Sequence, residues 1–139
     1  MILAAAQTKP KRGDISANLL NHYQLIELAA ENGATLIAFP ELSITGYERE
    51  NAEALVFTKD DYRIDHLKEL ATKNNIVIIA GAPIKIDSKM FIGEFIIAPD
   101  DSVSIYTKQF LHEGEDEFFD STFDYDPMLT IEDQNISFA

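Results

Sequence analysis

Cysteine is absent from all 139 residues of the sequence. The chain can therefore form no disulfide framework and no thiolate metal site of its own, and it offers no cysteine nucleophile. Long hydrophobic runs are also missing, because none approaches the roughly 20 residues that a membrane-spanning helix needs. The apolar stretch from Met1 to Ala6 is too short for the core of a signal peptide, and basic residues follow it instead of preceding it. We therefore expect a cytoplasmic protein with no membrane partner.

Basic side chains are scarce, with 11 Lys and Arg against 24 Asp and Glu and a net charge of −13. A chain this acidic is repelled by phosphate backbones and anionic lipid, so we expect no nucleic-acid partner. The sequence also lacks a glycine-rich phosphate loop and the G-x-S-x-G turn of serine hydrolases. Its three histidines have no zinc-like spacing, and we assign no ligand role to His22, His66 and His112.

Length and composition indicate one domain, since 139 residues with 46% hydrophobic side chains can bury a core. The first part of the chain predicts a β-α-β unit, which implies a parallel pair of strands with a right-handed crossover. The expected elements are a strand at 2–7 in a central place in the sheet, a helix from Asp14 or Ser16 to about Asn32, and a strand at 36–39. The apolar stripe of this helix is expected at Leu19, Tyr23, Ile26 and Ala30, widened by Leu20.

The remaining sequence predicts a second helix, a third strand and several hairpin strands. In chain order these are one helical turn within 51–57, a helix from Asp60 or Asp61 to Asn74, a strand at 76–80 closed by Gly81-Ala82-Pro83, a hairpin of 90–98 with 103–108, a polar loop at 109–127, a strand at 129–132, a turn at 133–135 and a strand at 136–139. The fold class is therefore α/β. Because the chain stops within an apolar strand pattern, we expect it to be a fragment of a longer domain.

The segment from Leu36 to Tyr47, which reads L-I-A-F-P-E-L-S-I-T-G-Y, places a carboxylate directly after a buried strand. Pro40 cannot donate to a sheet ladder and keeps Phe39 extended, so the strand stops there. Glu41 then lies just beyond the carboxyl end of the strand, where open α/β sheets commonly bind ligands. Partial burial at this point would suit the carboxylate to proton transfer near neutral pH. The segment alone fits a solvated loop carboxylate equally well.

A second segment, Y-x-K-x-x-L from Tyr106 to Leu111, places Lys108 at the end of a predicted strand. By itself it fits a surface lysine after a hairpin. The acidic run from Glu113 to Glu117, followed by two phenylalanines, is by itself typical of a solvated loop.

Taken together, the two segments resemble the catalytic motifs of the nitrilase superfamily, the carbon–nitrogen hydrolases. F-P-E-L-S-I-T-G-Y is similar to the motif that carries the general base of the family, which implies that role for Glu41. Y-x-K-x-x-L follows the expected G-A-P strand and is similar to the motif whose lysine stabilises the tetrahedral intermediate. The resemblance therefore implies that Lys108 holds the developing negative charge, as an ammonium in a dry cleft can.

The family often carries a further glutamate ahead of an aromatic pair, where it orients the lysine and the nucleophile. Glu115 fits this place best, with Glu113 and Glu117 as alternatives. The sequence departs from the family pattern after the aromatic pair, because Asp120-Ser121 stands where Pro-Gly is usual.

The resemblance covers essentially the whole chain but only the first part of the family domain. It implies an α-β-β-α sandwich, here incomplete, with residues 1–139 as the N-terminal portion of a single carbon–nitrogen hydrolase domain. The third catalytic residue of the family is a cysteine, and Ile136-Ser137-Phe138-Ala139 resembles the strand that leads into it. The implied function is hydrolysis of a small amide, nitrile or carbamoyl compound by a Glu-Lys-Cys triad, without a cofactor or metal, in a protein that typically forms homodimers. Without the cysteine, the chain alone is expected to be inactive.

Two other classes of function stay open. A metal-dependent phosphoesterase of similar layered architecture would bind Mg²⁺ through Glu41, but the further Asp and His residues that it needs are not found in the sequence. A non-catalytic half domain or interaction module is consistent with the missing cysteine. The mass of the source protein discriminates between them, since a product that continues into a cysteine supports the enzyme.

Overall fold

Five strands form one mixed sheet whose spatial order follows the order of the sequence. The structure is a computed structural model that describes residues 1–138. The strands are β1 (Leu3–Ala5), β2 (Leu36–Ala38), β3 (Val77–Ile86), β4 (Lys89–Ile97) and β5 (Val103–Thr107). β1, β2 and β3 are parallel, whereas β3, β4 and β5 are antiparallel. The sheet therefore changes from crossover connections to hairpins at β3, and the predicted α/β class is confirmed.

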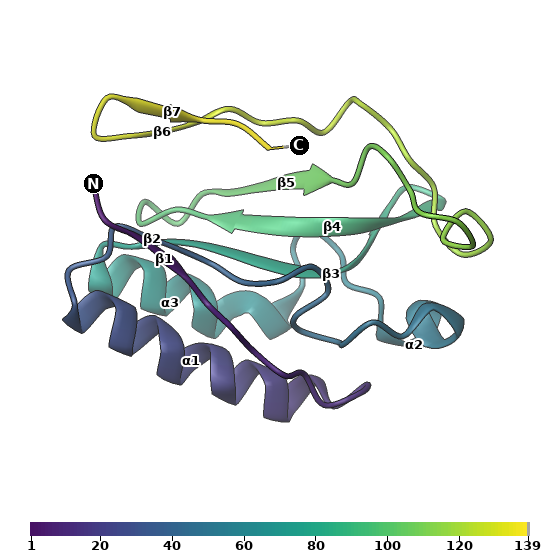
Figure 1. The fold of residues 1–139 in the computed structure, drawn as a ribbon, viewed down its shortest axis with the longest axis horizontal. Helices are drawn as coiled ribbons and strands as arrows, with labels where there is room; N and C mark the ends of the chain where they lie inside the picture. The colour runs from purple at the N-terminus through teal and green to yellow at the C-terminus, as the bar shows by residue number, and fades with distance from the viewer. Residues whose placement is uncertain (139) are drawn as a thin grey trace.

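Two long helices cover one face of the sheet (Figure 1). Helix α1 (Ile15–Glu31) is capped by Asp14, whose carboxylate accepts the Ala17 N–H at 3.1 Å. Helix α3 (Asp65–Asn74) ends at Asn75, which takes the left-handed conformation common after a helix. The short helical segments η1 (Arg49–Asn51), α2 (Ala52–Leu55) and η2 (Tyr62–Ile64) lie between β2 and α3. Within residues 1–138, no helix combines the length and the apolar character that crossing a membrane requires.

The buried face of α1 differs in part from the predicted stripe. Leu19 and Ile26 are buried as expected, but Leu20 is 59% exposed, so the predicted widening at Leu20 is wrong. The stripe widens through His22 and Ala29 instead, because these residues lie three positions after Leu19 and Ile26 on the same helix face.

The core has a helix side and an opposite side. On the helix side, Ile37, Ile78 and Phe95 from three strands pack with Leu67 and Ile26 from the two helices.

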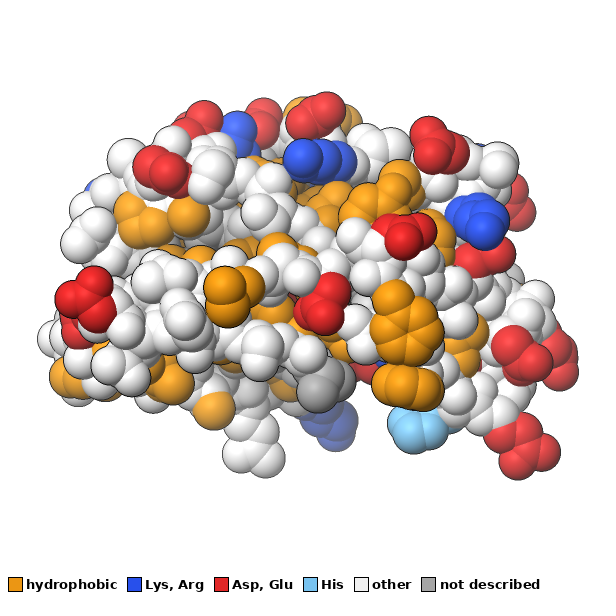
Figure 2. Space-filling view, turned by 90° about the horizontal axis from the view of Figure 1, so that it is seen from above, with side chains coloured by type: hydrophobic (Ala, Val, Ile, Leu, Met, Phe, Trp, Pro, Cys, Tyr) orange, Lys and Arg blue, Asp and Glu red, His pale blue; other side chains and the backbone are white. Residues whose placement is uncertain are grey.

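On the opposite face, the hairpin of β6 (Leu129–Ile131) and β7 (Gln134–Ile136) lies over the sheet (Figure 1). Ile136 and Phe138 pack there against buried side chains of β2 to β5, and the Phe138 ring stacks on Tyr106 with centroids 5.2 Å apart. Figure 2 views this face and shows hydrophobic side chains reaching the surface, with acidic side chains around the margin and a few among them.

Two predictions about the strands are wrong. The first strand lies at one end of the described sheet instead of its centre, because the crossover through α3 puts β3 on the opposite side of β2. The third strand does not close at Gly81-Ala82-Pro83 but runs on to Ile86. The Pro83 carbonyl accepts the Phe57 N–H at 2.8 Å, on the side of β3 that faces away from β4. In a strand, the carbonyl and the N–H of one residue point to the same side, so the N–H that proline lacks would also point away from β4. No hydrogen bond between β3 and β4 is lost.

The C-terminal strand prediction also needs correction. β7 ends at Ile136, where a strand at 136–139 was expected to begin, and Ala139 lies outside the described residues. Glu132 and Asp133 both have positive φ, as the tightest hairpin turns require. The turn therefore consists of two residues, 132 and 133, and not of the expected residues 133–135. The second strand of the hairpin begins at Gln134 and ends at Ile136, which pairs with Leu129.

Candidate active site

Glu41 lies in a tight turn that follows β2. The chain leaves the sheet at Phe39, and Leu42 takes a left-handed conformation with φ of 52°, so the backbone reverses immediately after Glu41. The Ile44 N–H donates to the Gly81 carbonyl at 3.0 Å and fastens the turn to β3. The Glu41 side chain keeps 40% of its surface exposed. The carboxylate is therefore presented to solvent at the end of the sheet by a backbone that is itself fixed.

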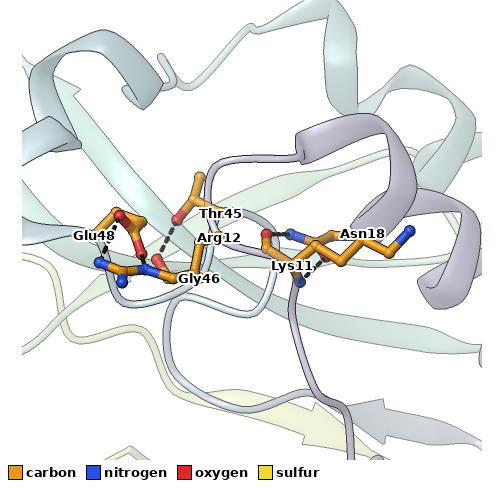
Figure 3. Close-up of polar contacts among 6 residues, drawn as sticks. All are labelled: Lys11, Arg12, Asn18, Thr45, Gly46 and Glu48. Carbon is orange, nitrogen blue, oxygen red and sulfur yellow. Dashed lines mark hydrogen bonds and ion pairs between the residues drawn. The ribbon is translucent and has the colours of Figure 1, made fainter.

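The segment after this turn is joined to the loop that precedes α1 (Figure 3). Asn18 exchanges hydrogen bonds with the Lys11 backbone at 2.7 and 2.9 Å and donates to the Ile44 carbonyl at 3.0 Å. Arg12 and Glu48 form an ion pair with two hydrogen bonds. The hydrogen bond from Arg12 lowers the pKa of Glu48 against the opposing effect of burial. These contacts hold residues 44–48 in place.

His22 supports the turn from below, a role that the sequence did not predict. Its ring is 1% exposed and stacks on Phe39, with ring centroids 4.0 Å apart. One ring nitrogen lies 2.7 Å from the Asn18 carbonyl, and the other lies 2.9 Å from the Ser43 hydroxyl. Burial lowers the pKa of His22, although the Asn18 carbonyl acts in the opposite direction. A neutral ring donates to Asn18 and accepts from Ser43, so α1 is tied to the residue two positions after Glu41.

Lys108 follows directly after β5, and its backbone N–H donates to the Ile92 carbonyl at 2.8 Å. Its Nζ lies 3.0 Å from Glu41 Oε2 and 3.1 Å from Glu115 Oε2, and its side chain is 16% exposed. Burial lowers the pKa of Lys108, but hydrogen bonds to both carboxylates outweigh it and leave the pKa raised. The ammonium is therefore charged and held between two acids.

Glu115 is fully buried beside Lys108. It accepts hydrogen bonds from the Tyr47 hydroxyl at 2.7 Å and from the His112 N–H at 2.7 Å. Burial pushes the pKa of Glu115 up, but the Tyr47, His112 and Lys108 contacts outweigh it and leave the pKa lowered. Glu113 and Glu117 are both exposed. Of the three glutamates considered from the sequence, Glu115 is the one that the fold brings to Lys108.

A cleft of about 370 Å³ opens beside Glu41 and Lys108. Its apolar walls include Phe39, Ile79, Ile92 and Phe110, and Glu94 of β4 also lines it. Sequence reasoning missed Glu94, which reads there as one polar residue within an apolar strand.

The candidate residues therefore meet at one end of the sheet. Glu41, Lys108 and Glu115 come from three separate segments and join in one hydrogen-bonded cluster at the mouth of a partly apolar cleft. Over residues 1–138, no group of three or more His, Cys, Asp or Glu side chains is arranged to hold a metal ion.

A carboxylate next to an ammonium in such a cleft is suited to proton transfer and to the stabilisation of an oxyanion. The model of the family "Carbon-nitrogen hydrolase" matches residues 2–124. The chain belongs to this family.

Two curated relatives are nitrilases or homologues of nitrilases. The chain is 27% identical over 113 residues to an arylacetonitrilase of Aspergillus niger, and the alignment covers 73% of this chain and 34% of that protein. It is 34% identical over 70 residues to "Nitrilase homolog 2" of Dictyostelium discoideum, which covers 50% of this chain and 21% of that protein. The alignments thus span 34% and 21% of the length of these two relatives.

Solved structures share the fold at low identity. XC1258 of Xanthomonas campestris, a CN-hydrolase superfamily protein with an arsenic adduct in its active site, gives a TM-score of 0.87 at 16% identity, covering 97% of this chain and 51% of that one. A variant of the amidase from Nesterenkonia sp. AN1, with a covalent addition at its active-site cysteine, gives 0.82 at 22% identity, covering 97% and 53%. The fold is that of the nitrilase superfamily, and the chain spans about half the length of these two proteins.

Proposed function

We propose that residues 1–139 form the N-terminal portion of a single carbon–nitrogen hydrolase domain and supply three of its active-site groups. In this proposal Glu41 is the general base, Lys108 stabilises the oxyanion and Glu115 positions Lys108. The observation that supports it most is the ammonium of Lys108, which lies 3.0 Å from one carboxylate and 3.1 Å from the other. The nucleophile has to be a cysteine from outside these residues, because the sequence contains none.

The proposed reaction divides one difficult step into two. Glu41 takes the proton of the cysteine thiol, and the thiolate attacks the carbonyl carbon of a small amide. The carbonyl oxygen becomes negatively charged beside Lys108. Glu41 then gives its proton to the nitrogen, the carbon–nitrogen bond breaks, and the amine or ammonia departs. The acyl group stays on the cysteine as a thioester. A water molecule loses a proton to Glu41 and attacks the thioester carbon. The carbon–sulfur bond then breaks, the acid is released, and Glu41 returns the proton to the sulfur, which restores the thiol. Nitriles and carbamoyl compounds are further candidate substrates.

Glu115 has a supporting role in this scheme. Its carboxylate is buried and accepts two hydrogen bonds from groups other than Lys108, so its position does not depend on a substrate. A lysine held in this way needs little rearrangement when negative charge develops on the substrate, and this preorganisation is the main source of electrostatic catalysis.

The test measures ammonia release from a panel of small amides by the protein as it occurs in its source, after its mass has shown whether a cysteine accompanies these residues. Glu41→Gln should lower the rate by about 10²–10⁴-fold, and Glu53→Gln, at an exposed position on α2, should leave it unchanged. Lys108→Ala should raise the activation free energy by about 3 kcal/mol. Near-normal turnover by Glu41→Gln would remove Glu41 from the mechanism.

A second candidate function is a non-catalytic interaction module, and the absence of cysteine from the 139 residues favours it. The 139-residue chain alone should release no ammonia in either case. A source protein that has no cysteine and no amidase activity would support the module. Location in the cytoplasm and assembly into homodimers belong to the hydrolase proposal, and sedimentation of the source protein tests the second of these.

A further inference from the structure

One acid in the cleft has no role in the proposed reaction. Glu94 lies on β4 and lines the same cleft as Glu41 and Lys108. Its Oε2 atom is buried and has no hydrogen-bond partner among residues 1–138. Leaving a buried polar group without a partner is unfavourable, and native proteins contain few such groups. An unpaired carboxyl group in a cleft therefore points to a partner that binds there.

The Glu94 carboxyl group fits against Gly81, its cross-strand neighbour on β3, because glycine has no side chain there. A Cβ atom added at Gly81 would lie 2.8 and 3.1 Å from the two carboxyl oxygens of Glu94. It would also lie 2.6 Å from the Leu42 nitrogen, in the turn that carries Glu41. The Glu94 carboxyl group thus occupies the place of a side chain at position 81, next to the Glu41 turn.

The surroundings favour the neutral form of Glu94. Burial raises the pKa of Glu94 well above its ordinary value, and the negative charge of Glu41 acts in the same direction. The nearby Lys108 ammonium is already paired with two other carboxylates. A neutral carboxylic acid offers one O–H donor and one carbonyl acceptor, and a primary carboxamide presents the matching acceptor and N–H donor.

We propose that Glu94 is a specificity-determining residue, whose carboxyl group hydrogen-bonds a second polar group of a small amide held with its reacting carbonyl at Glu41 and Lys108. The inference rests on the proposed function and deepens it. The apolar walls of the cleft suit a short hydrocarbon spacer. The substrate class is therefore small aliphatic amides that carry a second, neutral amide-like group.

The experiment measures binding, which needs no cysteine. Three amides are titrated into the protein as it occurs in its source, with any active-site cysteine replaced by alanine so that no turnover occurs, and binding is followed by amide chemical shifts in nuclear magnetic resonance spectra. Succinamide carries a second carboxamide, 4-methylpentanamide replaces that group by a hydrocarbon of the same shape, and β-alaninamide carries an ammonium. Succinamide should bind at least about tenfold more tightly than 4-methylpentanamide, since one added net hydrogen bond of about 1.4 kcal/mol corresponds to that factor.

Variants assign the preference to Glu94. Glu94→Leu should abolish the preference, and Glu94→Gln, which keeps a donor and an acceptor, should retain it. Glu117→Gln, at an exposed position, should behave like the wild type. If Glu94→Leu does not fold, the three amides on the wild type and on Glu94→Gln decide the matter.

Three results would overturn the inference. The first is that succinamide does not bind, and the second is that succinamide and 4-methylpentanamide bind with equal affinity. The third is that β-alaninamide binds more tightly than succinamide, which would mean that an ionised Glu94 binds a cation. Persistence of the preference in a folded Glu94→Leu would equally remove Glu94 from recognition. Because binding is measured without turnover, the binding result can be interpreted even if the source protein releases no ammonia.

Discussion

Replacing Glu115 by glutamine removes one charge from the centre of the site and keeps the volume of the side chain. The carboxylate accepts from the Tyr47 hydroxyl, the His112 N–H and the Lys108 ammonium. A glutamine has one acceptor oxygen and an NH₂ group that donates. At least one of the three surrounding donors therefore faces the NH₂ group of the glutamine instead of an acceptor. Lys108 also loses the negative charge of its buried partner.

The expected loss of unfolding free energy follows from these contacts. Hydrogen bonds to a charged group contribute about 1.5–3 kcal/mol each, and removal of one partner from a buried ion pair costs about 3–5 kcal/mol. Lys108 keeps its contact with Glu41 and a 16% exposed side chain, which offsets part of the penalty. We therefore expect Glu115→Gln to lower the free energy of unfolding by about 3 kcal/mol at neutral pH.

Urea denaturation at two pH values tests this prediction. Since the pKa of Glu115 is lowered in the folded chain, its stabilising effect is present above the ordinary value of 4.5 and is lost as the pH falls through the lowered pKa. The difference in unfolding free energy between the wild type and Glu115→Gln should therefore be smaller at acidic pH than at neutral pH. Glu117→Gln should change the stability by less than about 0.5 kcal/mol. Equal losses for the two variants, or a gap that does not depend on pH, would refute the reasoning.

Three further changes test the packing and the electrostatics by the same denaturation assay. Leu67→Ala, at a side chain with no exposed surface, should lower the free energy of unfolding by about 2–5 kcal/mol, whereas Leu20→Ala should change it by less than about 0.5 kcal/mol. Gly81→Ala should cost about 1–3 kcal/mol, because the new Cβ would lie 2.6 Å from the backbone nitrogen of Leu42; a neutral result would contradict the close packing. The raised pKa of Glu94 makes wild-type stability fall by about 1.4 kcal/mol for each pH unit between 4.5 and that pKa, and Glu94→Gln should flatten this slope.

Much of the fold could be predicted from local sequence, because the relevant signals are local. Four apolar residues followed by Pro40 define the end of β2 and hence the place of Glu41. The turn around Pro99 defines the hairpin that ends at Thr107, directly before Lys108. The choice of Glu115 came from family resemblance, and its burial beside Lys108 depends on a loop whose path no periodic pattern predicts.

Features that depend on distant neighbours could not be predicted in this way. Pro83 has the local signature of a strand end, yet β3 continues, because its nitrogen faces away from β4. Glu94 is an ordinary polar residue in a strand until the cleft around it is known. His22 was also missed, although its spacing from Leu19 and Ile26 on the helix is a local signal that places it on the buried face.

The order of strands in the sheet also has a consequence for how the chain folds. Each strand pairs with the strand next to it in the sequence, and the turns that join β3, β4 and β5 are short. Short loops close with little loss of entropy, so these three strands can assemble as a local unit. β2 can join this unit only after the longer crossover through α3 has closed. Lys108 directly follows the last strand of the local unit, and Glu41 lies in the turn after β2, so their ion pair forms only when both folding steps are complete.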